Sequence, residues 1–287
     1  MGIAPTVFIN FVYHDILTGL TEVGSLSFLK RVMPVFRELL HAALDLAFPP
    51  RQVCPLCGVD SPKGAVCSEC AALLAGYANE RACPCCGSYP GSGNSGVNLI
   101  YPVHPVLCPD CRSGRPFELA RAVGPYEEPL RDAVHQLKYY RARGLARPMA
   151  VLMAETFRSE AAYNRTRGLV PVPLHPARER WRGFNQAVLL ARALGEITGV
   201  PVLERAVARI RETPPQTGLT RYERLRNLEE AFRVQKSEQI TGKIITIVDD
   251  VFTTGSTVSI LSQQLRQAGA TGVMVLTFAI ARQTGRS

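Results

Sequence analysis

The chain has 287 residues, of which 46% are hydrophobic and 20% are charged, and it carries a formal net charge of +9. This composition is typical of a folded soluble protein with room for one α/β domain and a smaller module. No run of about 18 apolar residues occurs, which excludes a transmembrane helix, and the positive charge favours phosphorylated or polyanionic partners.

The first 50 residues predict two segments. Residues 1–25 have a mixed pattern and are interpreted either as a flexible extension or as a misassigned start. Residues 26–50 place apolar side chains at helical spacing, with charged side chains on the other side, and end at Pro49-Pro50. This segment predicts an amphipathic helix, whose apolar stripe either packs on its own domain or binds a partner or a membrane surface.

Residues 51–117 contain four C-x-x-C pairs, and each pair aims two thiolates at one metal ion. The pairs are Cys54/Cys57, Cys67/Cys70, Cys83/Cys86 and Cys108/Cys111. Because two pairs complete a tetrahedral Cys₄ site, we predict a double zinc ribbon with two structural Zn²⁺ ions, joining the first pair with the second and the third with the fourth. A crossed arrangement and redox-active cysteines are the alternatives. Cys85 is surplus and is not expected to be a ligand.

The grouping of the cysteines also bears on the compartment. A secreted disulfide scaffold is disfavoured, because the pairs lie in one segment of a fairly large chain. A cytoplasmic location is expected instead. Structural zinc most often folds a segment too small for its own core, although such ribbons also bind nucleic acid.

Residues 118–287 alternate between strand and helix patterns, which predicts an α/β fold with a parallel sheet. Helices are expected at 128–140 and after residue 184, and strands at 120–123, 169–175, 231–234, 244–248 and 272–280. The loop predicted at 176–184 contains Arg178, Arg180 and Arg182. Guanidinium groups at the sheet edge where ligands bind are suited to holding a pyrophosphate.

The most informative stretch is residues 244–257, IITIVDDVFTTGST. An apolar, β-branched strand ends at Asp249 and Asp250, and a helical pattern begins at Val258. The loop between them offers hydroxyls and a glycine to an anion at a helix N-terminus, through Thr253, Thr254, Gly255, Ser256 and Thr257. Two carboxylates would repel a bare phosphate, so we expect them to face sugar hydroxyls or Mg²⁺. The stretch therefore predicts a sugar phosphate site.

This stretch resembles the 5-phosphoribosyl-1-pyrophosphate (PRPP) signature of type I phosphoribosyltransferases. The resemblance implies that Asp249 and Asp250 hold the ribose hydroxyls and that residues 253–257 hold the 5′-phosphate. It also implies Mg²⁺ as a cofactor. In the family the first strand-to-helix loop binds pyrophosphate, which here corresponds to the loop at 176–184 with its three arginines. A P-loop ATPase is disfavoured, because the chain has no G-x-x-x-x-G-K-[ST] motif.

Further strings are similar to the ComF-type competence proteins, a subgroup with a double zinc ribbon before the transferase domain. They are VPVPLHP at 170–176, RGFNQ at 182–186 and TPPQTGLTR at 213–221, together with the cysteine pairs. The resemblance implies a role in DNA uptake and natural competence. The polar residues Gln216, Thr217 and Arg221 of the third string are interpreted as an active-site lid, with an ordinary surface loop as the alternative.

The leading hypothesis from the sequence is a Mg²⁺-dependent phosphoribosyltransferase that takes PRPP and an unidentified acceptor. No general base stands out, so no catalytic residue is assigned. The alternative is a non-catalytic adaptor that uses its zinc ribbons and basic surface to bind single-stranded DNA or competence proteins.

Overall fold

The computed structural model describes residues 52–89, 107–139, 142–211 and 231–283, and the chain from Gln52 to Ser287 forms one compact unit. The predicted extension at 1–25 and the predicted amphipathic helix at 26–50 lie outside the described residues. So does the polar segment 213–221. The division of this unit near residue 117 stays a prediction.

A four-stranded parallel sheet forms the centre of the fold, with the strand order β1-β6-β5-β2. The strands are β1 (Leu119–Pro125), β2 (Gly168–Pro171), β5 (Ile244–Phe252) and β6 (Gly272–Ile280). All nine residues of β6 are buried. Such continuous burial is expected of a parallel strand with helices on both of its faces. The predicted α/β fold with a parallel sheet is confirmed.

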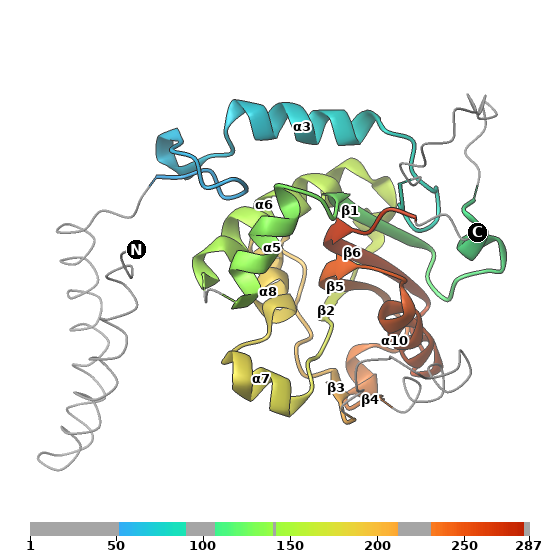
Figure 1. Cartoon of the computed structure of the whole chain (residues 1–287). Coiled ribbons are helices and arrows are strands. Elements are labelled where there is room, and N and C mark those ends of the chain that lie inside the picture. The colour runs from blue at the N-terminus through green and yellow to red at the C-terminus, as the bar shows by residue number, and fades with distance from the viewer. Residues whose placement is uncertain (1–51, 90–106, 140–141, 212–230, 284–287) are drawn as a thin grey trace, which may run out of the picture. The chain divides into compact units, whose positions relative to one another are not determined.

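Helices cover both faces of this sheet (Figure 1). One face is packed by α5 (Leu130–Tyr139), α6 (Ala146–Ser159) and α8 (Gln186–Thr198), and the other by α10 (Ser256–Gln267). The cysteine-rich segment contributes α3 (Ser68–Asn79) and the single turn α4 (Pro109–Arg112). Within the described ranges, short 3₁₀ helices lie at Pro62–Gly64, Arg143–Leu145, Ala161–Arg165 and Ser237–Gln239.

A short helix, α7 (Pro176–Arg182), replaces most of the loop predicted at 176–184. The His175 side chain accepts the Ala177 N–H, and Pro176 occupies the first turn. Gly183 ends the helix in the left-handed region at φ 82°. The sequence carries these start and stop signals, because proline is favoured at the first helical position and glycine just after the last. Strand β2 accordingly ends at Pro171 instead of residue 175.

Two strand predictions also differ from the structure. Strand β5 continues through Asp249 and Asp250 to Phe252, because Val251 and Phe252 still pair with residues of β6. The strand expected to join the main sheet at 231–234 forms β4 (Phe232–Val234), which pairs antiparallel with β3 (Val207–Arg209) in a separate two-stranded sheet.

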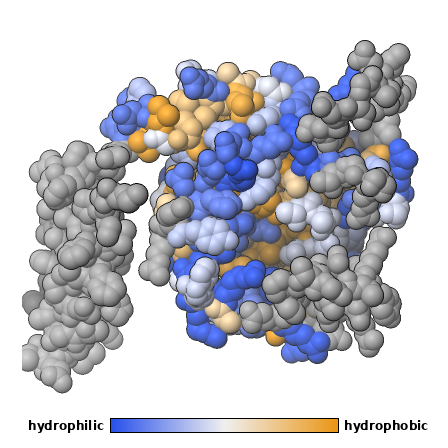
Figure 2. Space-filling model, in the orientation of Figure 1, coloured by the Kyte–Doolittle hydropathy of each residue, from blue (hydrophilic) through white to orange (hydrophobic). Residues whose placement is uncertain are grey.

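The cysteine-rich segment packs against β1, which is an edge strand of the main sheet. The Ala120 N–H donates to the Cys85 carbonyl over 2.8 Å, so the turn around Cys85 occupies part of that edge. A Cβ added to Gly87 would lie 2.7 Å from the Ala120 carbonyl oxygen. Figure 2 shows apolar residues at the surface along α3, where Leu73 is 38% exposed.

Two cysteine clusters and a candidate phosphate site

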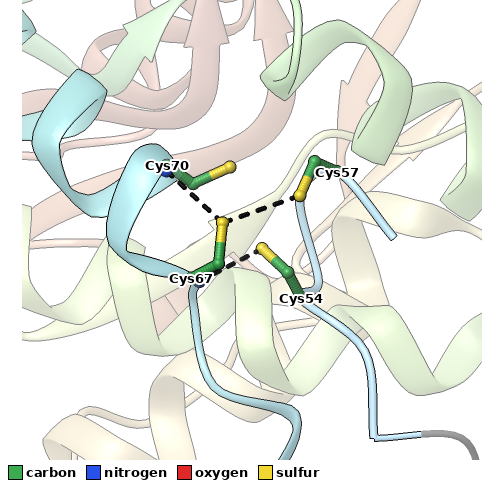
Figure 3. A group of neighbouring side chains, drawn as sticks. All are labelled: Cys54, Cys57, Cys67 and Cys70. Carbon is green, nitrogen blue, oxygen red and sulfur yellow. Dashed lines mark hydrogen bonds between the residues drawn. The ribbon is translucent and has the colours of Figure 1, made fainter. Parts of the chain in front are cut away.

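The first cluster joins a turn to the start of α3 (Figure 3). Cys54 and Cys57 come from the turn, Cys67 is the N-cap residue of α3, and Cys70 lies in its first turn. The Sγ atoms of Cys57 and Cys67 are 3.7 Å apart, and the Cys67 N–H lies 3.4 Å from Cys54 Sγ. Cys57 is exposed, whereas Cys54 and Cys70 are buried.

The second cluster repeats this arrangement with Cys83, Cys86, Cys108 and Cys111, all of which are buried. The Sγ atoms of Cys86 and Cys108 are 3.7 Å apart, and the Cys108 N–H lies 3.4 Å from Cys83 Sγ. The first C-x-x-C pair therefore forms a cluster with the second, and the third forms a cluster with the fourth. The crossed arrangement does not occur.

Both clusters fit a tetrahedral zinc ion. A Zn–S bond of about 2.3 Å places sulfur atoms about 3.8 Å apart at the corners of a tetrahedron. One Sγ pair in each cluster is 3.7 Å apart, and all four sulfur atoms of a cluster lie within 4.8 Å of one another. All nine cysteines lie in the described ranges, and all are free thiols. A hydrogen bond from Cys86 outweighs burial and lowers the pKa of Cys83 to about 4, and the same contact raises the pKa of Cys86. Each group could therefore hold Zn²⁺, with Cys85 in neither.

The turn between β5 and α10 has the features of an anion site. Gly255 adopts φ 76° directly before the helix, and a Cβ there would lie 2.5 Å from Cζ of Phe252. Glycine is therefore required both by the backbone conformation and by the packing. The Thr254 and Ser256 hydroxyls are 2.8 Å apart at the N-terminus of α10, whose first N–H groups have no partner within the helix. Thr253 and Thr254 are exposed, while Ser256 and Thr257 are partly buried.

The two acids have different surroundings. Asp250 is buried, and its carboxylate forms an ion pair with Lys138 of α5 and accepts the amide of Gln186 of α8 over 2.9 Å. Asp249 is partly buried and accepts the backbone N–H of Asp250 over 2.9 Å. Burial and, next, the negative charge of Asp250 raise the pKa of Asp249 well above its ordinary value. Asp250 is therefore the more firmly held of the two.

The three arginines of α7 also separate into two kinds. Arg178 and Arg180 are exposed, and Trp181, which directly follows Arg180, is 70% exposed. Arg182 is buried, where it donates to the Gln186 side chain and lies 5.6 Å from the centre of the Tyr139 ring. A guanidinium is thereby connected through Gln186 to Asp250. The proposed lid residues Gln216, Thr217 and Arg221 lie outside the described residues.

Sequence reasoning did not assign three residues that the fold brings to this region. They are Lys138, Gln186 and Arg115, which contacts the β5–α10 turn. Gln186 and Lys138 belong to segments noted in the sequence, the RGFNQ string and a helix end. Nothing in the local pattern around Arg115 indicates its contact, because Thr254 is 139 positions away in the chain.

The fold and the clusters define a parallel α/β protein preceded by two four-cysteine groups. Competence protein F from Haemophilus influenzae is 31% identical over 66% of this chain and 83% of its own length. The DNA utilization protein YhgH from Escherichia coli is 34% identical over 78% of this chain and 94% of its own. This chain belongs to the competence protein F family, to which the sequence motifs pointed.

More distant comparisons give the following. Competence protein ComFC from Bacillus subtilis is 28% identical over 72% of this chain and 80% of its own. Adenine phosphoribosyltransferase from Saccharomyces cerevisiae is 19% identical over 50% of this chain and 71% of its own, with a TM-score of 0.32. No protein-family model matches the chain.

Among the described residues, no helix has the length and apolar character needed to cross a membrane.

Proposed function

We propose that this protein binds Mg²⁺–PRPP and transfers its phosphoribosyl group to an acceptor in DNA uptake or utilization. The observation that carries the proposal is the β5–α10 turn, where Gly255 at φ 76° and the adjacent hydroxyls precede a helix N-terminus. Asp249 lies six residues before Gly255, near the carboxyl end of the parallel strand β5. In open α/β sheets this edge is where ligands bind.

In this proposal, residues 253–257 receive the 5′-phosphate through backbone N–H groups and hydroxyls. Asp249 and Asp250 accept hydrogen bonds from the ribose, and the exposed Arg178 and Arg180 attract the pyrophosphate. Mg²⁺ supplies further neutralisation of the leaving group's charge when it is bound. The acceptor and a catalytic base remain unassigned.

Asp250 differs from Asp249 in the protein contacts with which a ligand has to compete. Its carboxylate already has an ion pair with Lys138 and a hydrogen bond from Gln186. A ribose hydroxyl can share that carboxylate, since each oxygen accepts more than one hydrogen bond. Asp249 has the weaker set of protein contacts, so we assign it the larger part of the sugar binding.

Calorimetry with Mg²⁺–PRPP on the full chain tests the proposal. Wild type is expected to bind at micromolar to millimolar ligand. Asp249→Asn is expected to lose at least tenfold in affinity, because the Asp side chain offers two acceptor oxygens to the ribose hydroxyls and the Asn side chain offers only one. Glu155→Gln on the exposed side of α6 is the matched control and should bind as wild type does. Absence of any wild-type binding at millimolar PRPP would contradict the proposal.

A second candidate function is contact with single-stranded DNA through α7 and its surroundings. Trp181 and Tyr139 are 70% and 54% exposed, and Arg178 and Arg180 are exposed on the same helix as Trp181. Exposed aromatic rings next to basic side chains are the usual means of binding single strands, by stacking of bases and attraction of phosphates. Zinc in the two clusters and a cytoplasmic location are part of both candidate functions.

The single tryptophan makes this second candidate easy to test. Stacking of a base on Trp181 is expected to quench the protein's tryptophan fluorescence as an oligothymidine is added. The affinity should fall steeply as salt rises from about 50 to 200 mM, because phosphate contacts release counterions. Arg178→Ala combined with Arg180→Ala should weaken the quenching, with Arg147→Ala as the control at an exposed site on α6. Unchanged fluorescence at saturating oligothymidine would contradict a role for α7.

A further inference from the structure

Arg115 connects the second cysteine cluster to the β5–α10 turn. It lies four residues after Cys111, and its Nη1 atom is 3.4 Å from the Thr254 carbonyl oxygen and 3.5 Å from the Ser259 hydroxyl. Its Nη2 atom is 3.7 Å from the Asp110 carboxylate. The side chain is 14% exposed, so the guanidinium has been withdrawn from solvent to make these contacts.

A second contact joins the same two segments. The rings of Phe117 and Phe252 meet edge to face with their centres 6.1 Å apart. Phe252 is also the residue against which Gly255 packs, since a Cβ at Gly255 would overlap its ring. The segment leaving the second cluster therefore supports the turn at two points, through Arg115 on the Thr254 carbonyl and through Phe117 on Phe252.

The Arg115 contact has a direct effect on the peptide that joins Thr254 to Gly255. In a trans peptide the carbonyl and the following N–H point in opposite directions. When Arg115 holds the Thr254 carbonyl, the Gly255 N–H is directed away from Arg115. Arg115 lies outside the β5–α10 segment, yet it thereby fixes the orientation of the Gly255 N–H, a potential hydrogen-bond donor to the phosphate. The guanidinium also adds positive charge beside the turn.

We infer that Arg115 is a positioning residue through which zinc in the second cluster controls affinity for the 5′-phosphate of the ligand. The inference rests on the proposed function, because it deepens the role of residues 253–257. The second cluster has to be folded for Arg115 to reach Thr254, since Cys108 and Cys111 lie on the α4 turn immediately before it. A small segment of this kind depends on its metal for folding.

The first cluster offers an internal comparison, because its segment contacts the sheet at other positions. A Cβ on Gly124 would lie 2.8 Å from the Tyr77 ring of α3, and Glu80 after α3 pairs with Arg282 over 2.7 Å. These contacts reach β1 and the residue region after β6, and none of them involves residues 253–257. Zinc in the first cluster should therefore matter for stability more than for phosphate affinity.

The test uses the full chain with Arg115→Ala and, as a matched control, Arg112→Ala. Arg112 is exposed and carries the same charge, but its side chain donates to the Leu107 carbonyl. Arg115→Ala should keep two zinc ions per chain by metal analysis and lose at least tenfold in affinity for both Mg²⁺–PRPP and ribose 5-phosphate. Its affinity for inorganic pyrophosphate should be unchanged, which separates a defect in the turn from general loss of structure.

Amide hydrogen exchange gives a readout that needs no ligand. Exchange at residues 254–258 should accelerate in Arg115→Ala and remain at the wild-type rate in Arg112→Ala. Equal affinity of wild type and Arg115→Ala for ribose 5-phosphate, with equal exchange in the turn, would overturn the inference while leaving the proposed function in place. A wild-type chain that binds neither PRPP nor ribose 5-phosphate overturns the proposed function and the inference together.

Discussion

Gly255 is the position at which one added methyl group should do most damage to the candidate phosphate site. In Gly255→Ala, the new Cβ would lie 2.5, 3.0 and 3.2 Å from three carbon atoms of the Phe252 ring. Phe252 is 3% exposed and packs against Phe117, so its ring cannot move away without disturbing the core. Alanine would also have to adopt φ 76°, a left-handed conformation.

Two contributions set the expected loss in the free energy of unfolding of Gly255→Ala. A left-handed conformation costs a residue with a Cβ about 1–2 kcal/mol, and forcing extra volume into a packed region costs about 1–3 kcal/mol. The free energy of unfolding should therefore fall by about 2–5 kcal/mol if the turn keeps its shape. If the turn relaxes instead, the loss of stability will be smaller and the affinity for Mg²⁺–PRPP will fall further.

Urea unfolding and calorimetry on two control variants separate these contributions. Gly242 has φ 72° with nothing within 4 Å of an added Cβ, so Gly242→Ala should show the backbone cost alone. Gly144 has neither a positive φ nor a close neighbour, and Gly144→Ala should be near neutral. A Gly255→Ala variant that matches Gly242→Ala in stability and wild type in PRPP affinity would refute the packing argument.

Two further predictions concern stability. Because the pKa of Asp249 is raised, the folded chain retains a proton that the unfolded chain loses above about pH 4, so stability falls as pH rises through the folded-state pKa. Asp249→Asn should therefore be more stable than wild type at about pH 8 and no more stable near pH 3, in urea unfolding; a difference that does not vary with pH would contradict this. Tyr163→Phe should lose about 1–3 kcal/mol in the same assay, because the Tyr163 hydroxyl donates to the buried Val275 carbonyl over 2.6 Å; a neutral effect would mean that the carbonyl finds another donor.

The local pattern of the sequence was sufficient to predict a feature wherever the residues that form it are neighbours in the chain. The C-x-x-C spacing predicted two clusters, since each pair lies within one turn. The apolar run before Asp249 and the hydroxyls after it predicted β5, the turn and α10. The start and stop of α7 were also encoded locally, in Pro176 and Gly183, although the loop prediction passed over them.

Contacts between distant segments were decided only by the tertiary structure. Asp250 is held by Gln186 from 64 positions away, and Arg115 reaches Thr254 from 139 positions away. Such partners depend on how the helices pack on the sheet, which residue spacing does not record. The same packing buries Arg182 and leaves Arg178 exposed on one short helix. The sequence by itself determined which chemical groups this protein has at its sheet edge, whereas the packing of distant elements decided which of them remain open to a ligand.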